Sequence, residues 1–211
     1  MDNQTNKKAF MQQYKDPSNL AKRRALHEKF GTDKYDWYNW VFDHFNFPAK
    51  CKILELGSGI GTLWLNNKEK IQKDWDITLS DSFQEMLDNV KENLKGANHP
   101  FNFQLIDAEN IPYPDDSFDV VIANGLLYLV PELEKTIKEI ARVIKPGGTL
   151  IASTSGSKYM KELEDLITEA DLPVRKSYTK YSFSLDNGKN LLSPYFSKIE
   201  LFRKGGSLLV T

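Results

Sequence analysis

From position 51 onward, short apolar runs of strand-forming residues alternate with segments whose apolar side chains recur at helical spacing. The runs that predict strands are CKILEL (51–56), WDITLSD (75–81), FNFQLID (101–107), SFDVVIAN (117–124) and TLIAST (149–154). The segments between them predict amphipathic helices, as where Phe83, Met86, Val90 and Leu94 share one helical face. This alternation favours an α/β fold in which a doubly wound parallel sheet carries helices on both faces.

The two ends of the chain have a different texture. Residues 1–47 combine Lys, Asp and aromatic residues with apolar positions at roughly helical spacing, which predicts short helices. The segment YFSKIELFRKGGSLLVT (195–211) predicts two strands around Gly205 and Gly206. No repeat or change in composition marks a second domain. We therefore expect a single domain over residues 1–211, with 1–47 as a helical cap and 48–211 as the sheet-containing core.

Charge and composition narrow the possible partners. The chain carries 28 Lys and Arg against 29 Asp and Glu, so no global positive field attracts nucleic acid. The longest apolar run, 120–130, is too short to cross a bilayer and contains Asn124. Cys51 is the single cysteine, and the polar opening lacks the apolar core of a signal peptide. We expect a cytoplasmic protein that has neither a nucleic-acid nor a membrane partner.

The first predicted strand continues into a glycine-rich turn, ILELGSGIGT. In open parallel sheets ligands bind over the carboxyl ends of the strands, and glycines there let a ligand approach the backbone. The spacing of Gly57, Gly59 and Gly61 differs from the G-x-G-x-x-G turn that binds dinucleotide diphosphates, because Thr62 stands where the third glycine would be. Glu55 would not favour an anionic diphosphate either. A carboxylate suits a ligand with an ammonium group, such as S-adenosylmethionine.

The second and third predicted strands end in aspartates. Asp81 closes the second strand, where a carboxylate can accept hydrogen bonds from both hydroxyls of a ribose. Capping the next helix is its alternative role, but Ser82 and Glu85 match a capping box that would fill that role. Asp107 and Ala108 end the third strand, where the acid can accept from an adenine amino group and the alanine leaves room for the ring. An ordinary turn is the alternative for Asp107.

With these residues in place, the chain resembles class I S-adenosylmethionine-dependent methyltransferases, in particular the small-molecule group similar to the ubiquinone and menaquinone biosynthesis enzymes. The turn ILELGSGIGT matches the family's acidic-x-Gly-x-Gly-x-Gly motif, and LSDSFQEML resembles its second-strand motif. IDAENIPYPDDSFDVVIANGLLYLV and EIARVIKPGGTLIAS are similar to the family's third to fifth strands, so the match covers about residues 51–155. The resemblance implies a Rossmann-like, seven-stranded, mostly parallel sheet with an antiparallel C-terminal hairpin. It also implies S-adenosyl-L-methionine as cofactor and S-adenosyl-L-homocysteine as product.

The expected cofactor residues lie at strand ends and on the N-terminal helices that cover such pockets. Asn124 and Gly125 end the fourth strand, beside the expected methionine end of the cofactor. The full set is Glu55, Gly57, Ser58, Gly59, Gly61, Asp81, Ser82, Met86, Asp107, Ala108, Glu109, Asn124, Gly125, Tyr14, Phe30 and Tyr35. The last three belong to an aromatic cluster that either packs the core of a helical cap or forms a lid around an apolar acceptor pocket. Its members are Phe10, Tyr14, Phe30, Tyr35, Trp37, Tyr38 and Trp40. No Cys and His cluster has metal-ligand spacing, so no metal is expected.

Methyl transfer from a sulfonium is an in-line displacement, so the protein mainly holds acceptor, methyl group and sulfur in line in a dry pocket. A base is needed only if the acceptor must lose a proton. His27 and His44 lie on the expected N-terminal helices, where a histidine is more often structural than catalytic, so we assign no catalytic residue. We expect a small, partly apolar acceptor. The alternatives are a non-catalytic S-adenosylmethionine-binding sensor or scaffold and, disfavoured by the glycine spacing, an NAD-dependent oxidoreductase.

Overall fold

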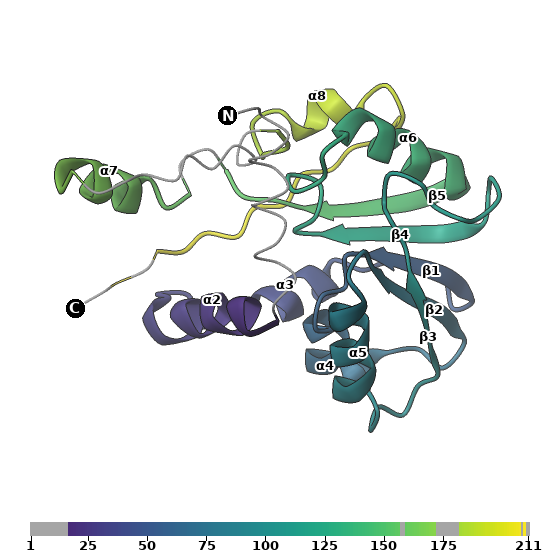
Figure 1. The fold of residues 1–211 in the computed structure, drawn as a ribbon. Helices are drawn as coiled ribbons and strands as arrows, with labels where there is room; N and C mark the ends of the chain where they lie inside the picture. Colours follow the sequence, from purple (N-terminus) through teal and green to yellow (C-terminus); the bar gives the residue numbers. More distant parts are fainter. Residues whose placement is uncertain (1–16, 157–158, 172–181, 208, 210–211) are drawn as a thin grey trace.

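The structure is a computed structural model that describes residues 17–156, 159–171, 182–207 and 209 (Figure 1). Its helices are α2 (Pro17–Phe30), α3 (Trp37–Asp43), α4 (Thr62–Asn66), α5 (Gln84–Asn93), α6 (Leu133–Val143), α7 (Lys161–Glu169) and α8 (Gly188–Leu192), with a 3-10 turn η1 (Lys68–Lys70). Its strands are β1 (Cys51–Leu56), β2 (Trp75–Asp81), β3 (Phe101–Leu105), β4 (Phe118–Asn124) and β5 (Ile144–Ser153). Strand and helix alternate along the core as the apolar pattern predicts, except that β4 follows β3 without a helix between them.

The strands form one five-stranded sheet in the order β3-β2-β1-β4-β5, and every neighbouring pair is parallel. Ile53 of the central strand lies opposite Ile77 of β2 on one side and Val120 of β4 on the other. The chain therefore builds outward from β1 to β3, then returns to the middle and builds outward through β4 to β5. This reversal creates a switch point between β1 and β4, where an open α/β sheet binds its ligand.

Both faces of β1 are buried, which explains its nearly continuous apolar sequence. Successive side chains of a strand point to opposite faces, so Ile53 joins an apolar cluster with Trp64 on one face while Leu54 joins a cluster with Ile140 on the other. All four side chains are fully buried. Each contributes roughly 1.5 to 3 kcal/mol of hydrophobic stabilisation, so the strands form a rigid base for the loops at their carboxyl ends.

The five predicted strands are confirmed, and β1 and β2 have the expected bounds. The last strand begins earlier than expected, at Ile144, because Pro146 cannot continue a helix and Gly147, at φ 79°, shifts the register between β4 and β5. Helix α8 was not predicted; its five residues are too few to give an apolar period. Within the described residues, no helix has the length and apolar character needed to cross a membrane.

The expected C-terminal hairpin does not form in the described part of the tail, where residues 196–207 and 209 contain no strand. The tail pairs instead with the end of α2. Ser207 O accepts from Thr32 N at 2.9 Å, and Leu209 N donates to Phe30 O at 2.8 Å. The Lys204 ammonium contacts the Asp33 carboxylate. Leu201, Phe202 and Leu209 of this segment remain exposed instead of packing into a sheet. The prediction of seven strands is therefore wrong for this part of the chain.

Candidate functional site

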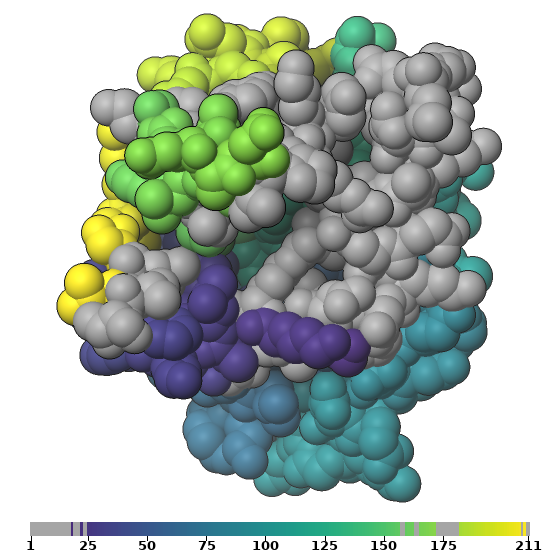
Figure 2. Space-filling view, turned by 60° about the vertical axis from the view of Figure 1, so that its left-hand side comes forward, coloured from purple at the N-terminus to yellow at the C-terminus, as the bar shows by residue number. Residues whose placement is uncertain are grey.

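A cavity of about 1330 Å³ lies over the carboxyl ends of the strands. Figure 1 shows α2, α7 and the C-terminal segment on the side toward which the arrows of β4 and β5 point. Figure 2 shows the same side as a surface, with α7 in green above the N-terminal helices in purple and the C-terminal segment in yellow beside them. The wall of the cavity therefore combines loops of the sheet with segments from both ends of the chain.

Most of the residues predicted from the sequence line this one cavity. They are Glu55, Gly57, Ser58, Gly59, Asp81, Ser82, Met86, Asp107, Ala108, Glu109, Asn124 and Gly125. Gly61 is not part of the described wall. A Cβ added to it would lie 2.4 Å from Cγ2 of Val90, so its role is to let the turn pack closely against α5. The glycine turn thus combines a ligand-facing part with a packing part.

The first half of the turn faces the cavity. Gly57 has a φ of 69°, a conformation that side chains other than glycine rarely adopt. Ser58 N donates to Ser80 O of β2 at 2.8 Å, which fixes the turn to the sheet. The Ser58 hydroxyl is buried and has no hydrogen-bond partner among the described residues. Because buried polar atoms are rarely left unpaired, this hydroxyl is available to a polar ligand.

Glu55 is 2% exposed and lies at the wall of the cavity. Its Oε2 accepts a hydrogen bond from Trp64 Nε1 at 2.5 Å. Burial raises the pKa of the Glu55 carboxyl to about 7; the bond from Trp64 opposes this shift, and the nearby Asp81 carboxylate adds to it. A cationic group placed in the cavity would favour the ionised form and bring this pKa down. The site therefore fits the ammonium group of a ligand.

Asp81 joins two turns of the site. One carboxylate oxygen accepts from Gly59 N and the other from Phe83 N, each at 3.0 Å, and burial raises the pKa of the Asp81 carboxyl. The expected capping box of Ser82 and Glu85 is wrong, because α5 begins after Phe83 and has no side-chain cap. Asp81 itself takes the Phe83 N–H. Its carboxylate oxygens each retain acceptor capacity toward the cavity, as a ribose would require.

Asp107 forms a turn and also lines the cavity. Its Oδ1 accepts from Glu109 N at 2.9 Å, so the alternative interpretation as a turn residue describes part of its role. Ala108, at 8% exposure, leaves space beside it. Glu109 is held by its own contact, in which Oε1 accepts from Glu132 N at 2.8 Å. This corner thus offers a fixed carboxylate beside a small residue.

Asn124 connects three elements at the end of β4. Its Oδ1 accepts from the Ser153 hydroxyl and, at 3.4 Å, from Trp37 Nε1 of α3. Ser153 also accepts from Gly125 N at 2.9 Å. The sequence analysis missed Ser153, and it placed Trp37 in the aromatic cluster but not among the expected cofactor residues. The signal for Ser153 was present, because a polar residue ends β5 just as Asp81 ends β2 and Asn124 ends β4.

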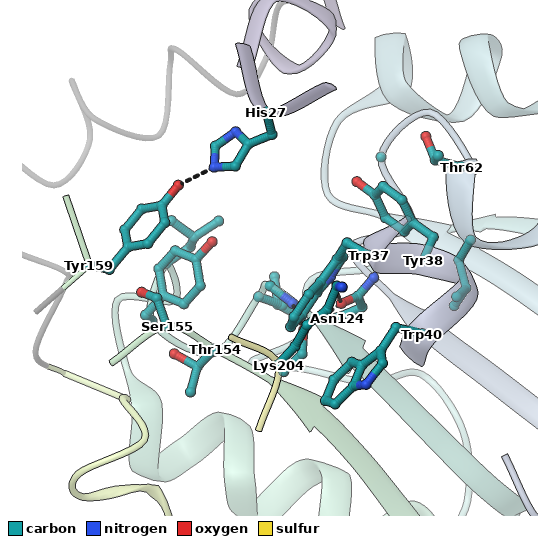
Figure 3. Close-up of a pocket in the computed structure, with 18 of the residues that line it drawn as sticks. His27, Trp37, Tyr38, Trp40, Thr62, Asn124, Thr154, Ser155, Tyr159 and Lys204 are labelled. Atoms are coloured by element: carbon teal, nitrogen blue, oxygen red, sulfur yellow. Dashed lines mark hydrogen bonds between the residues drawn. The ribbon is translucent and has the colours of Figure 1, made fainter. Parts of the chain in front are cut away.

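The aromatic residues that line the cavity differ from those expected. Trp37, Tyr38 and Trp40 of α3 lie on the wall, and the rings of Trp37 and Trp40 stack with centroids 5.4 Å apart (Figure 3). Phe30 and Tyr35 are not part of the described wall; the Tyr35 hydroxyl bonds to the Asp43 carboxylate at the surface. Tyr14 lies outside the described residues. The spacing of the two tryptophans, three apart on one helical face, was the signal that could have found them.

Of the histidines considered from the sequence, one reaches the cavity. His27 lines it, and its Nε2 lies 2.8 Å from the hydroxyl of Tyr159 (Figure 3). His44 lies elsewhere: its Nδ1 is 2.7 Å from Trp40 O, and its ring packs on Phe202 with centroids 4.4 Å apart. These two contacts give His44 a structural role.

Comparison with known proteins agrees with this geometry. Residues 54–152 match the family described as methyltransferase domain. This match supports a class I, S-adenosylmethionine-dependent methyltransferase domain over this part of the chain. The chain is similar to ubiquinone/menaquinone biosynthesis C-methyltransferases UbiE, with 27% identity to the Vibrio vulnificus protein over 71% of this chain and 54% of the relative. It has 29% identity to the Neisseria meningitidis protein over 71% of this chain and 56% of the relative.

The chain thus spans about half the length of the curated relatives it matches. The fold is also that of a solved SAM dependent methyltransferase from Aquifex aeolicus, with a TM-score of 0.60, 18% identity, and coverage of 85% of this chain and 87% of that one. S-adenosyl-L-methionine is the cofactor that the family implies. The residues present fit it, since a buried acid, an unpartnered serine hydroxyl and a strand-end aspartate face one cavity.

Proposed function

We propose that this protein transfers the methyl group of S-adenosyl-L-methionine to a small, partly apolar acceptor by in-line displacement. The observation that carries the proposal is that one cavity at the switch point of the sheet gathers the acids at the carboxyl ends of β1, β2 and β3. Each of these acids has a different partner to recognise on this cofactor. The balanced charge of the chain, −1 overall, supports a small-molecule acceptor rather than nucleic acid.

The proposed roles follow from position. Glu55 receives the ammonium group, because its buried carboxylate has no cationic partner among the described residues. Asp81 accepts from the ribose hydroxyls, and Asp107 accepts from the adenine amino group beside Ala108. Asn124 lies at the methionine end. The bound cofactor supplies a methyl group on a positively charged sulfur, and the protein's part is to hold the acceptor in line and exclude water.

We propose further that residues 1–47 act as a cap over this cavity. Support comes from α3, where Trp37 and Trp40 face the cavity, and from Asn66, whose Nδ2 donates to Asp36 at 3.0 Å beside the same helix. Large rings on the cap would exclude water from the sulfonium, and their faces attract cations. On this proposal the chain is one domain, with residues 48–211 as its core. A cytoplasmic location is also a proposal, resting on the single cysteine, Cys51.

The test has two stages. Titration calorimetry should show binding of S-adenosyl-L-methionine and S-adenosyl-L-homocysteine, and no binding of NAD. Turnover of methyl-labelled cofactor with a panel of phenols, thiols, amines and carbon acids should then identify an acceptor class. Binding with no turnover on any member would favour a sensor or scaffold, and methylation of bulk tRNA at comparable rates would contradict the small-molecule assignment.

A further inference from the structure

Two side chains from distant parts of the sequence meet on the wall of the cavity. The Tyr159 hydroxyl lies 2.8 Å from Nε2 of His27, although the residues are 132 positions apart (Figure 3). Their rings lie nearly parallel, at 8°, with centroids 6.1 Å apart. His27 comes from α2, while Tyr159 follows β5 and is held by a hydrogen bond from its N–H to Gly156 O at 3.1 Å. Both line the same cavity as the glycine turn.

This pair lies in the part of the cavity that an acceptor would use. The proposed cofactor residues lie at the carboxyl ends of β1, β2 and β3, so the methionine end of the cofactor would lie beside Asn124 at the end of β4. An acceptor attacks the methyl group from the side away from sulfur, so it must lie beyond β4, toward β5. Figure 3 shows Tyr159 beside Thr154 and Ser155, across the cavity from Thr62, which follows the glycine turn.

We propose that the methyl acceptor is a hydroxyl compound of the phenol class and that Tyr159 is the catalytic residue that takes its proton. His27 is the positioning residue, and it receives the proton that Tyr159 gives up. The inference rests on the proposed function. When the neutral imidazole carries its proton on Nδ1, Nε2 accepts from the tyrosine hydroxyl, and the tyrosine oxygen can still accept from the acceptor hydroxyl. Both residues are exposed enough for the imidazole to return its proton to water.

The atoms and charges of this step balance. The acceptor oxygen forms its bond to the methyl carbon while its proton moves to the Tyr159 oxygen, and the Tyr159 proton moves to His27 Nε2. The bond from carbon to sulfur breaks, and its electron pair stays on sulfur. The positive charge therefore passes from the sulfonium to the imidazole, and no further reactant is needed.

Other charged groups on the described wall fit this role less well. The Lys204 ammonium pairs with the Asp33 carboxylate and holds the pKa of Asp33 below its usual range. Asp33 is therefore a poor base. Glu109 accepts from a backbone N–H, as described above. Arg203 of the C-terminal segment is a cation and cannot take a proton. Glu162 of α7 has no hydrogen-bond partner among the described residues that would hold it in position. The carboxylates Glu55, Asp81 and Asp107 lie on the cofactor half.

The experiment compares two acceptors that differ in whether they still carry their proton. Phenol keeps its proton at neutral pH, whereas pentafluorophenol is already ionised and needs no base. Transfer of labelled methyl to phenol should fall by about 10²- to 10⁴-fold in Tyr159→Phe and His27→Gln, the usual range for general base catalysis. Transfer to pentafluorophenol should remain near the wild-type rate. Tyr195→Phe, the same change outside the described cavity wall, should leave both rates unchanged.

Equal losses on both acceptors would mean that the pair only shapes the cavity, which would overturn the inference. Wild-type transfer to thiols or amines but to neither phenol would also overturn it and leave the proposed function standing. No transfer to any acceptor, with cofactor binding intact, would instead remove the proposed function itself.

Discussion

Replacing Asp81 with Asn removes one charged acceptor from the residue that joins the two turns of the site. In the wild type, one carboxylate oxygen accepts from Gly59 N and the other from Phe83 N, both at 3.0 Å. Asparagine has a single side-chain oxygen, so its amide group must face one of these N–H groups. The substitution keeps the size of the side chain but loses its charge and one of its two internal hydrogen bonds.

The expected magnitude follows from these contacts. A hydrogen bond to a charged group contributes roughly 1.5 to 3 kcal/mol, so losing the contact to one N–H should lower the free energy of unfolding by about that amount. The bound ribose loses a charge-assisted partner at the same time. Affinity for S-adenosyl-L-homocysteine should therefore fall by about ten- to a hundredfold.

Calorimetric titration and urea denaturation measure the two effects separately. Asp119→Asn is the matched control, because Asp119 also accepts from a backbone N–H, that of Lys52 at 2.8 Å, and lies near the amino end of β4, away from the cavity. The control should lower stability and leave affinity unchanged. Unaltered affinity in Asp81→Asn would refute the ribose assignment, and equal weakening in both variants would show that affinity merely follows stability.

Three further outcomes are expected. The pKa of Glu55 is raised from its ordinary 4.5 to about 7, so its contribution to stability is present below pH 4.5 and is lost as pH rises through 7. The loss should be on the order of 3 kcal/mol in the free energy of unfolding. Denaturation of Glu55→Gln at the same pH values should lack this change. Gly61→Ala should lower the free energy of unfolding by about 1 to 3 kcal/mol, because the added methyl group clashes with Val90. Gly147→Ala has a similar φ but open space around it, so it should lower the free energy of unfolding only by its backbone strain, about 1 kcal/mol. Equal costs in the two variants would contradict the packing role of Gly61. Hydrogen exchange over residues 17–47 should slow when S-adenosyl-L-homocysteine is added, and equal exchange in both states would mean a static cap.

The cofactor half of the site was predictable because local signals specify it. Each acid follows an apolar run that forms a strand, and parallel strands bring such ends to one edge of the sheet. Glu55, Asp81 and Asp107 could therefore be placed together before any contact was known. The same rule would have found Ser153, since it too ends a strand.

Other features were not predictable because they depend on packing between distant segments. The start of α5 is fixed by Asp81 taking the Phe83 N–H, a competition that a capping pattern does not contain. Trp37 rather than Tyr35 lines the cavity because α3 packs Trp37 against the end of β4, where its Nε1 contacts Asn124. The pairing of His27 with Tyr159 joins residues 132 positions apart, which no local period can report.

The same division explains why the cofactor is easier to identify than the acceptor. The family match ends at residue 152, so it contains the glycine turn and the acids of the first three strands. The pair proposed to act on the acceptor lies outside it, since His27 precedes the match and Tyr159 follows it. A shared cofactor half therefore carries no information about the molecule that receives the methyl group. The acceptor must be sought through the residues outside the match, where a hydroxyl and an imidazole meet across the cavity.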